Sequence, residues 1–199
     1  MLKFIRSLFL VIILTTVGFA QVEIDAAAPN FKLTDSKGTA HSLSDFAGKY
    51  VVLEWINFDC PFVKKHYNSK NMQNLQKQYT AKGVVWLQIN SSAEGKQGNF
   101  SSEEINKRNA EHGSNATAYL IDADGTVGKL YGAKTTPHMY VINPKGTLIY
   151  AGAIDDKPSS KVEDIEGAVN YVANALDAAH AGKEVAVKTT APYGCSVKY

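Results

Sequence analysis

The residue best suited to chemistry in this sequence is Cys60, which is followed directly by a proline and then by a stretch of helical character. A thiol is a nucleophile only as the thiolate, and the positive end of a helix lowers the pKa of a cysteine from about 8.5 toward neutrality or below. Pro61 suits the first helical position, where its missing N–H costs nothing. The pattern therefore predicts a reactive thiol at a helix N-terminus. The alternative is an inert buried cysteine, since free cysteine is among the most buried residue types.

The first 20 residues have the pattern of an export signal. A positive start and an apolar run are followed by a small-x-small cleavage pattern at residues 18–20. An uncleaved membrane anchor is the alternative, although a bilayer span needs about 20 apolar residues, more than this run provides. We expect a protein of the periplasm or cell envelope that meets the membrane only through its export signal. Its expected parts are a signal peptide (1–20), one folded domain (21–182) and a C-terminal tail (183–199).

Charge and length narrow the class of protein. The leader holds two of the 21 Lys and Arg residues and none of the 19 Asp and Glu residues, so the mature chain has no net charge. Arg108 is its one arginine. Such a chain lacks the basic surface that nucleic-acid binding requires, so no nucleic-acid partner is expected. The mature length suits a single domain with its own core.

Turn signals along the chain indicate alternating strands and helices, which is typical of an α/β protein. Ser101 and Glu104 form a capping box for one helix, and an apolar stripe at helical spacing marks the last one. The expected elements are a hairpin at 31–41, strands at 50–57, 84–90, 119–122, 138–142 and 147–151, and helices at 61–79, 101–112 and 165–179.

Three segments carry a resemblance to a known family. They are Ala28-Pro29-Asn30-Phe31, Glu54-Trp55-Ile56-Asn57-Phe58-Asp59-Cys60-Pro61-Phe62-Val63 and Thr135-Thr136-Pro137-His138-Met139-Tyr140. Together with the order of the elements, they resemble the thioredoxin fold and, more narrowly, the redoxin family (AhpC/TSA-like, peroxiredoxin-like), over residues 27–181. The resemblance implies an α/β thioredoxin-like fold, with a central mixed sheet flanked by helices and an N-terminal β-hairpin.

The resemblance also implies roles for individual residues. Cys60 matches the attacking cysteine of the thioredoxin Cys-x-x-Cys motif, and Thr136-Pro137 matches the cis-proline loop that faces that sulfur. Glu54 matches a buried acid that moves protons for the resolving thiol. Burial is expected to raise its pKa, unless a neighbouring lysine pairs with it. The implied substrate-binding residues are Pro61, Phe62, Thr136 and His138, the last because it directly follows the cis-proline.

The sequence departs from both family patterns at the reactive cysteine. Val63 stands where thioredoxins have the second cysteine, so exchange within that motif is impossible. The peroxiredoxin signature has Pro seven and Thr three residues before its cysteine, where this chain has Leu53 and Asn57. That signature also has a partner arginine, and Arg108 does not stand at an obvious position for it. These departures weigh against efficient peroxide reduction.

Cys195, in a Gly-Cys context on the tail, is the second cysteine of the chain. It is the natural candidate for a resolving thiol, because no cysteine stands at the second position of the Cys-x-x-Cys motif. The alternative is a static disulfide clamp between Cys60 and Cys195, which would stabilise the fold by ~5 kcal/mol in the chain-entropy model. The sequence alone leaves both roles open.

A metal site is a further possibility at Cys60. With His138 and His66 it would form a soft N/S copper site, as in the Sco-type copper chaperones of the same fold. The paired cysteines of those chaperones are missing, and lone histidines are more often packed or surface residues, so no metal is expected. Asp122-x-Asp124-Gly125 lacks the later acidic ligand of a calcium loop and is better explained as a tight turn.

These observations lead to a functional hypothesis. The chain is expected to be an exported thiol–disulfide oxidoreductase in which Cys60 attacks a disulfide-bearing protein or a peroxide, with antioxidant activity in the second case, and Cys195 resolves the product. No nucleotide or flavin motif is present, so no cofactor is expected and another protein thiol must act as reductant. The alternative is a copper-handling or client-binding module with an inert disulfide between Cys60 and Cys195.

Overall fold

The computed structural model describes residues 22–199, so the expected signal peptide lies outside the described part of the chain. No helix in that part is both long and apolar enough to cross a membrane. Its strands and helices are β1 (Lys32–Asp35), β2 (Ala40–Ser42), β3 (Val51–Trp55), α1 (Pro61–Asn68), α2 (Asn71–Thr80), β4 (Val85–Asn90), α3 (Ser102–His112), β5 (Ala118–Ile121), α4 (Thr126–Tyr131), β6 (Thr135–Thr136), β7 (His138–Ile142), β8 (Leu148–Gly152), α5 (Tyr171–His180) and β9 (Cys195–Ser196). Two short 3₁₀ turns lie at Leu43–Phe46 and Val162–Ile165.

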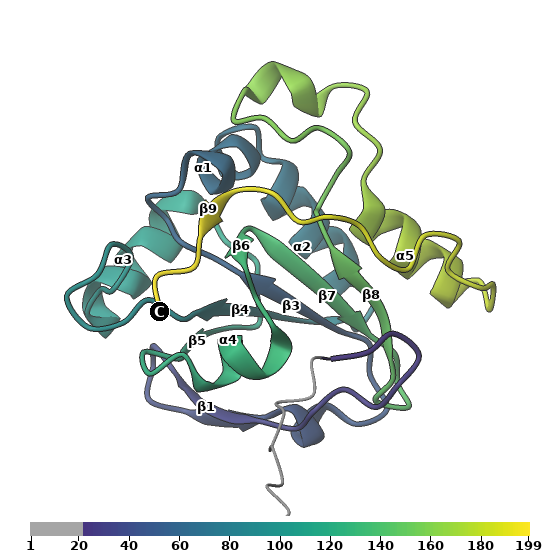
Figure 1. Cartoon of the computed structure of the whole chain (residues 1–199), viewed down its shortest axis with the longest axis horizontal. Coiled ribbons are helices and arrows are strands. Elements are labelled where there is room, and N and C mark those ends of the chain that lie inside the picture. Colours follow the sequence, from purple (N-terminus) through teal and green to yellow (C-terminus); the bar gives the residue numbers. More distant parts are fainter. Residues whose placement is uncertain (1–21) are drawn as a thin grey trace, which may run out of the picture.

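A mixed sheet with strand order β2-β1-β5-β4-β3-β7-β8 forms the centre of the described chain (Figure 1). Strands β3, β4 and β5 are parallel, whereas β1, β7 and β8 each run antiparallel to the strand that they join. The hairpin β1–β2 adds to the edge beside β5. This architecture confirms the thioredoxin-like α/β fold, with its N-terminal hairpin, that the sequence predicts.

The central strand β3 shows how the sheet separates two cores. All five of its residues are buried, as expected for a strand that is covered on both faces. Val52 and, just past the strand, Ile56 pack with α1, α2, α3 and α5. Leu53 and Trp55 pack on the opposite face with α4 and the 3₁₀ turn at Leu43–Phe46. Because side chains alternate along a strand, Glu54 shares the face of α1 and α2.

The first helical region differs from the single helix expected at 61–79. The helix is interrupted after Asn68, because Lys70 adopts a left-handed conformation (φ 63°) and begins α2. A non-glycine residue in that region costs free energy and persists only where its surroundings hold it. Here the side chain of Asn71, the first residue of α2, donates to His66 Nδ1 in α1 at 2.9 Å. This contact joins the two helices across the break.

Two other elements differ from expectation. The last helix begins at Tyr171 rather than near Ile165, because Asn170 caps it by accepting the N–H of Ala173 at 2.9 Å. The turn after β5 continues into α4, which the sequence analysis does not predict. Asp122 fixes this helix by accepting two backbone N–H groups of its first turn at 3.0 and 2.8 Å.

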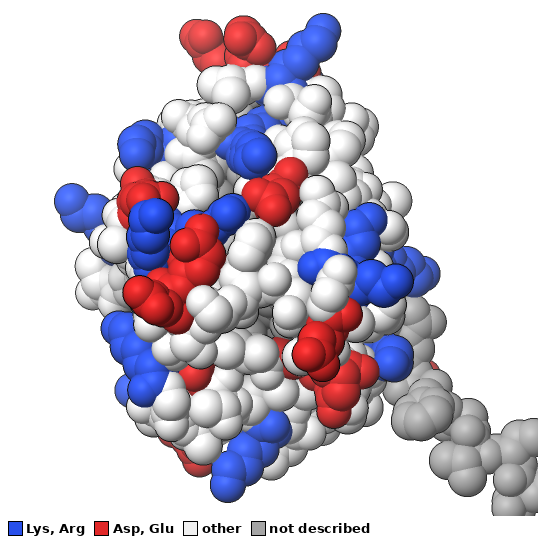
Figure 2. All heavy atoms as spheres, turned by 90° about the vertical axis from the view of Figure 1, so that its left-hand side faces the viewer, with Lys and Arg blue, Asp and Glu red and all other residues white. Residues whose placement is uncertain are grey.

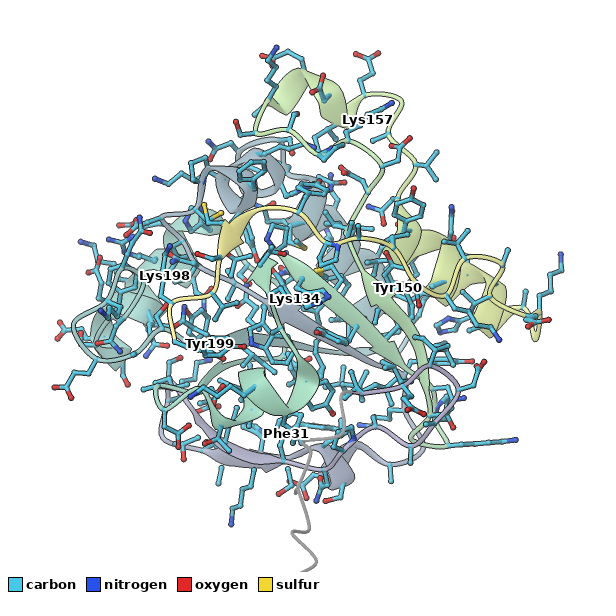
Figure 3. The ribbon with its side chains drawn as sticks, in the orientation of Figure 1. Phe31, Lys134, Tyr150, Lys157, Lys198 and Tyr199 are labelled. Atoms are coloured by element: carbon cyan, nitrogen blue, oxygen red, sulfur yellow. The ribbon has the colours of Figure 1, made fainter. Side chains whose placement is uncertain are left out.

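The C-terminal tail (residues 183–199) returns from α5 across the molecule and places β9 beside β6, the short strand before the cis-proline (Figure 1). It ends against α4, where Lys129 Nζ lies 5.4 Å from the ring centroid of Tyr199 (Figure 3). The Tyr199 hydroxyl donates to the Ala133 carbonyl at 2.7 Å. The tail is therefore held at its end as well as in the strand pair.

Charged side chains of both signs are interspersed on the face that is turned toward the viewer in Figure 2, which corresponds to the left-hand side of Figure 1. One of the ion pairs contributed by α3 joins Arg108 to Glu104 at 2.7 Å. Uncharged surface separates the charged groups in the same view. This side of the molecule therefore presents no extended area of a single sign.

Candidate functional site

Cys60 is the N-cap of α1, and Pro61 is the first helical residue. The Cys60 backbone N–H donates to the Asn57 carbonyl (3.0 Å), and its carbonyl accepts the N–H of Lys64 (2.9 Å), so the turn between β3 and the helix is fixed. The positive end of the helix therefore lies at this residue. The side chain is fully buried (0% exposed), so the thiol is covered in this state of the protein.

The cis-proline loop faces the sulfur. The peptide bond between Thr136 and Pro137 is cis, and the Cys60 thiol donates to the Thr136 carbonyl at 3.0 Å. The buried Thr136 hydroxyl has no hydrogen-bond partner among residues 22–199. Once Cys60 loses its proton, this hydroxyl is free to donate to the thiolate. Thr136 thus provides an acceptor for the thiol, its carbonyl, and a donor for the thiolate, its hydroxyl.

Cys195 reaches the same place from the C-terminal tail. Strand β9 pairs antiparallel with β6, and Cys195 lies opposite Thr136. Both cysteines are free thiols, and the Cys195 side chain lies near enough to Cys60 to lower the pKa of its thiol. The backbone leaves no room for a side chain at Gly194, since a Cβ there would lie 2.1 Å from the Thr136 carbonyl oxygen. The glycine before Cys195 is therefore required for this close approach.

The two thiols have opposite electrostatic environments. Burial raises the pKa of Cys60, but hydrogen bonds to the thiolate from Cys195 and Thr136 and from backbone N–H groups outweigh it, so the net pKa lies below the usual value. Burial and the facing Cys60 raise the pKa of Cys195 to about 11. A low pKa favours the nucleophile, and a high pKa favours the proton donor. Of the two thiols, Cys60 is therefore the one that loses its proton more readily.

Glu54 lies at the centre of a buried polar network. It accepts hydrogen bonds from Trp86 Nε1 (2.7 Å), the Tyr67 hydroxyl (2.8 Å) and Gln76 Nε2 (3.1 Å). Burial raises its pKa to about 7, although these hydrogen bonds act in the opposite direction. Its partners are neutral side chains, so the alternative of a lysine pair is excluded. A carboxyl with this pKa exchanges its proton near neutral pH.

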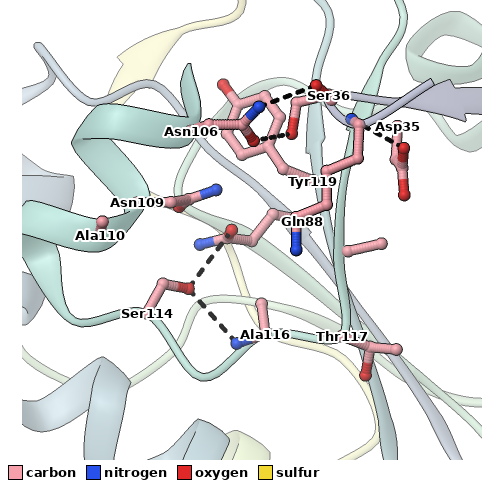
Figure 4. Close-up of a pocket in the computed structure, with 12 residues that line it drawn as sticks. Asp35, Ser36, Gln88, Asn106, Asn109, Ala110, Ser114, Ala116, Thr117 and Tyr119 are labelled. Carbon is pink, nitrogen blue, oxygen red and sulfur yellow. Dashed lines mark hydrogen bonds between the residues drawn. The ribbon is translucent and has the colours of Figure 1, made fainter. Parts of the chain in front are cut away.

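The network of Glu54 leads to a polar cavity of about 250 Å³ beside α3 and β5 (Figure 4). Gln88 donates to the Tyr67 hydroxyl at 2.5 Å, and Ser114 bonds to Gln88 Oε1 at 3.5 Å. Gln88 and Ser114 both line the cavity, as does Tyr119. Neither cysteine lines this cavity. The hydrogen bonds through Tyr67 and Gln88 therefore link the cavity to Glu54 and not to Cys60.

The implied substrate-binding residues are only partly brought together. Pro61 is exposed beside Cys60, and Phe62 is half-buried against the core that contains Cys60. His138 points to the other face of the sheet, where its ring lies 4.5 Å from that of Tyr140 between centroids. Burial, followed by the charge of Lys134, lowers the pKa of His138 to about 3. The structure therefore does not place the His138 ring at the sulfur.

The residues that depart from the peroxiredoxin pattern have structural partners. Asn57 accepts the N–H of Asp59 at 3.0 Å and donates to the Gln97 carbonyl at 3.2 Å. Arg108 lies nearer to the reactive turn than the sequence indicates, because it donates to Asp59 at 3.0 Å. Its other partner, Glu104, is also a carboxylate, so the positive charge of Arg108 is balanced away from the sulfur.

His66 does not join Cys60 in a metal site. Its two ring nitrogens are occupied by Asn71 (2.9 Å) and by the Tyr193 hydroxyl (3.1 Å). Within the described range, no three His, Cys, Asp or Glu side chains are grouped so that they could hold a metal ion. Sequence reasoning missed Tyr193, whose only signal was its place two residues before Cys195.

A cysteine at the N-terminus of α1, a cis-proline loop facing it and a buried acid beneath the helix define a thioredoxin-fold redoxin. The comparisons with known proteins agree with this class. The model of the AhpC/TSA family matches residues 24–151, and the chain belongs to this family. The resemblance noted in the sequence is thereby confirmed.

Individual relatives include a named oxidoreductase. The chain is 26% identical over 156 residues to the thiol-disulfide oxidoreductase ResA of Bacillus subtilis (strain 168), covering 73% of this chain and 82% of that protein. An uncharacterized conserved protein from Geobacillus kaustophilus has a similar structure (TM-score 0.75, 30% identity, 90% of this chain and 93% of that chain). The thioredoxin domain of a thiol-disulfide oxidoreductase from Bacteroides vulgatus shares the fold (TM-score 0.52, 19% identity, 73% and 97% coverage). This protein is thus a redoxin related to thiol–disulfide oxidoreductases.

Proposed function

We propose that this protein is an exported thiol–disulfide oxidoreductase in which Cys60 attacks and Cys195 resolves. The observation that carries the proposal is the placement of Cys195 on a strand paired with Thr136, the residue that bonds to the Cys60 sulfur. The lowered pKa of Cys60 and the raised pKa of Cys195 support this division of roles. The proposal of export depends on the pattern of residues 1–20 and is tested by locating the protein in cell fractions.

The reaction proceeds in two exchanges. The Cys60 thiolate attacks one sulfur of a partner disulfide, forming a mixed disulfide and releasing the other partner sulfur as a thiolate. Cys195 then loses its proton and attacks the Cys60 sulfur, which releases the second partner thiolate and leaves a disulfide between Cys60 and Cys195. The partner has gained two electrons, and an external protein dithiol returns the pair to the reduced state.

Glu54 is the proposed group for moving protons in this cycle. Its pKa of about 7 allows it to hold or release a proton near neutral pH. It lies on the face of the sheet that carries α1, the helix that begins at Cys60. The Tyr67 hydroxyl donates to Glu54 and accepts from Gln88, which lines the polar cavity, so the carboxyl is connected to polar surroundings.

A protein disulfide is better supported as substrate than a peroxide. Asn57, at the position of the peroxiredoxin threonine, uses its amide in backbone contacts, and Arg108 is paired with carboxylates. The copper-handling alternative loses support, because the His138 ring lies on the other face of the sheet. Residue 63 is Val, so the second sulfur of the exchange has to come from the tail.

The test uses the two cysteines, which are the only ones in the chain. The wild-type protein is mixed with a model protein disulfide and with oxidised glutathione, and the products are followed by intact mass. We expect disulfide formation between Cys60 and Cys195 in the wild type, a trapped mixed disulfide in Cys195→Ser and no reaction in Cys60→Ser. Activity that survives in Cys60→Ser would refute the proposal. Peroxide consumption is measured in parallel and is expected to be much slower.

A further inference from the structure

A cluster of buried charged and polar side chains lies beside the tail, outside the cysteine pair. It contains Lys65 and His66 from α1, Asp155 from the segment after β8, and Tyr193 from the tail. Lys65, His66 and Asp155 are 1%, 0% and 2% exposed. Lys65 Nζ donates to the Lys157 carbonyl at 2.7 Å and lies 3.4 Å from Asp155 Oδ2. Buried charges of this kind are costly unless each one is paired and hydrogen-bonded.

The Tyr193 hydroxyl completes this cluster. It donates to Asp155 Oδ1, and Lys65 donates to it at 3.4 Å. His66 is neutral, since burial and then the charge of Lys65 lower its pKa to about 3. Asn71 donates to His66 Nδ1, so Nε2 carries the proton and donates to the Tyr193 hydroxyl at 3.1 Å. Tyr193 thus has a charged acceptor and a charged donor, and such hydrogen bonds are stronger than neutral ones.

The position of Tyr193 links this anchor to the redox pair. It lies two residues before Cys195, and two extended residues span only about 7 Å. Its ring packs edge to face on Phe62, in the first turn of the helix that begins at Cys60, with centroids 5.9 Å apart. Tyr193 therefore attaches the tail to the same helix that carries the attacking sulfur. Thr190, which accepts the Ala153 N–H at 2.9 Å, holds the tail farther upstream.

We propose that Tyr193 is a positioning residue that docks the tail and sets Cys195 against Cys60. This inference rests on the proposed function and adds the control of its two steps. The docked tail covers Cys60, so a partner disulfide reaches the thiolate only when the tail is released. Once the mixed disulfide exists, docking through Tyr193 brings back Cys195, which loses a proton, attacks the Cys60 sulfur and releases the partner as a thiolate.

The variant Tyr193→Phe removes the hydroxyl and keeps the ring against Phe62. We expect opposite effects on the two steps: faster attack by Cys60, because the tail is released more easily, and slower resolution by Cys195. Each rate should change by about tenfold, the scale of one hydrogen bond to a charged group. A role that is only structural would not move the two rates in opposite directions.

The matched control is Tyr50→Phe, which removes a half-buried hydroxyl that donates to the Ala179 carbonyl at 3.0 Å, at the opposite end of β3 from Cys60. Both rates are read with less than one equivalent of a symmetrical aromatic disulfide, which releases one coloured thiolate on attack and its second only when Cys195 resolves the mixed disulfide. Attack alone is measured in the Cys195→Ser background. Circular dichroism checks that each variant is folded, and Tyr50→Phe is expected to leave both rates unchanged.

The wild type and Tyr193→Phe together distinguish a failure of the proposed function from a failure of the inference about Tyr193. If the wild type releases only one coloured thiolate, Cys195 does not resolve, and the proposed function fails together with the inference. If the wild type releases two and Tyr193→Phe resolves at the same rate, the proposed function stands and the inference is overturned. An equal fall in both rates would also overturn it, because a general loss of stability slows both steps alike.

Discussion

Glu54 allows a prediction whose sign and size follow from its surroundings. In the unfolded chain its carboxyl has the ordinary pKa of 4.5, whereas burial raises the folded pKa to about 7. The folded protein therefore keeps a proton that the unfolded chain releases between these two pH values. The contribution of Glu54 to stability is complete below about pH 4.5 and is lost as the pH rises through about 7.

The size of the effect follows from the gap between the two pKa values. Each pKa unit corresponds to about 1.4 kcal/mol, so the gap between 4.5 and about 7 corresponds to a loss of about 3 kcal/mol in the free energy of unfolding. Two buried histidines act in the opposite direction over part of this range. The pKa values of His66 and His138 are lowered to about 3, so they reduce stability as the pH falls below about 6.5.

The variant Glu54→Gln isolates the carboxyl, because glutamine is neutral at every pH and similar in size. Urea unfolding of Glu54→Gln and of its parent is measured from pH 4 to 9 in a background in which both cysteines are serine. The free energy of the parent minus that of the variant should fall by about 3 kcal/mol between pH 4.5 and 7 and stay constant above about pH 8. The histidine contributions cancel in this difference. A difference that is flat, or that rises with pH, would show that Glu54 is ionised throughout and would refute the reasoning.

Three further variants test the tail and the buried charges. Gly194→Ala would bring a Cβ within 2.1 Å of a backbone oxygen of β6, so the free energy of unfolding in urea should fall by about 1–3 kcal/mol. Cys60 should also be alkylated faster, and an unchanged alkylation rate would contradict this prediction. Asp155→Ala leaves the buried charge of Lys65 without its carboxylate and should cost about 3–5 kcal/mol in the same assay, whereas a loss below about 1 kcal/mol would mean that Lys65 is not charged there. Cys195→Ala removes the side-chain donor that faces the Cys60 sulfur, so the pKa of Cys60, titrated by ultraviolet absorbance, should rise, and an unmoved midpoint would contradict this contact.

Local signals in the sequence are sufficient to predict the central part of the fold and of the site. The apolar run of β3, the Cys60-Pro61 step and the Asn143–Gly146 turn each constrain their own few residues, and the structure has β3, α1 and the β7–β8 hairpin there. Family resemblance adds the cis peptide bond before Pro137, which spacing alone does not reveal. These features depend on short-range chemistry or on a shared motif, so they can be predicted from the sequence.

Features that depend on tertiary contacts were not predictable in this way. The break at Lys70 has no glycine or proline to mark it and is joined by a side-chain contact from Asn71 to His66. Lys65 looks like an ordinary surface lysine of a helix, yet it is buried against Asp155, which is 90 residues away. The place of Tyr193 two residues before Cys195 does not reveal its role, because the role depends on hydroxyl contacts to residues far away in the sequence.

The same contacts explain how the second thiol of this protein can lie outside the helix that begins at Cys60. In a Cys-x-x-Cys motif both sulfurs belong to one helical turn, so the resolving thiol is always near and the attacking thiol stays open to partners. Here Val63 occupies that position, and Cys195 arrives on a strand that also covers Cys60. Resolution and access then depend on one equilibrium, the docking of the tail. Strong docking favours resolution and hinders attack, so a tail held by a short strand pair and a few defined hydrogen bonds, that of Tyr193 among them, can serve both steps in turn.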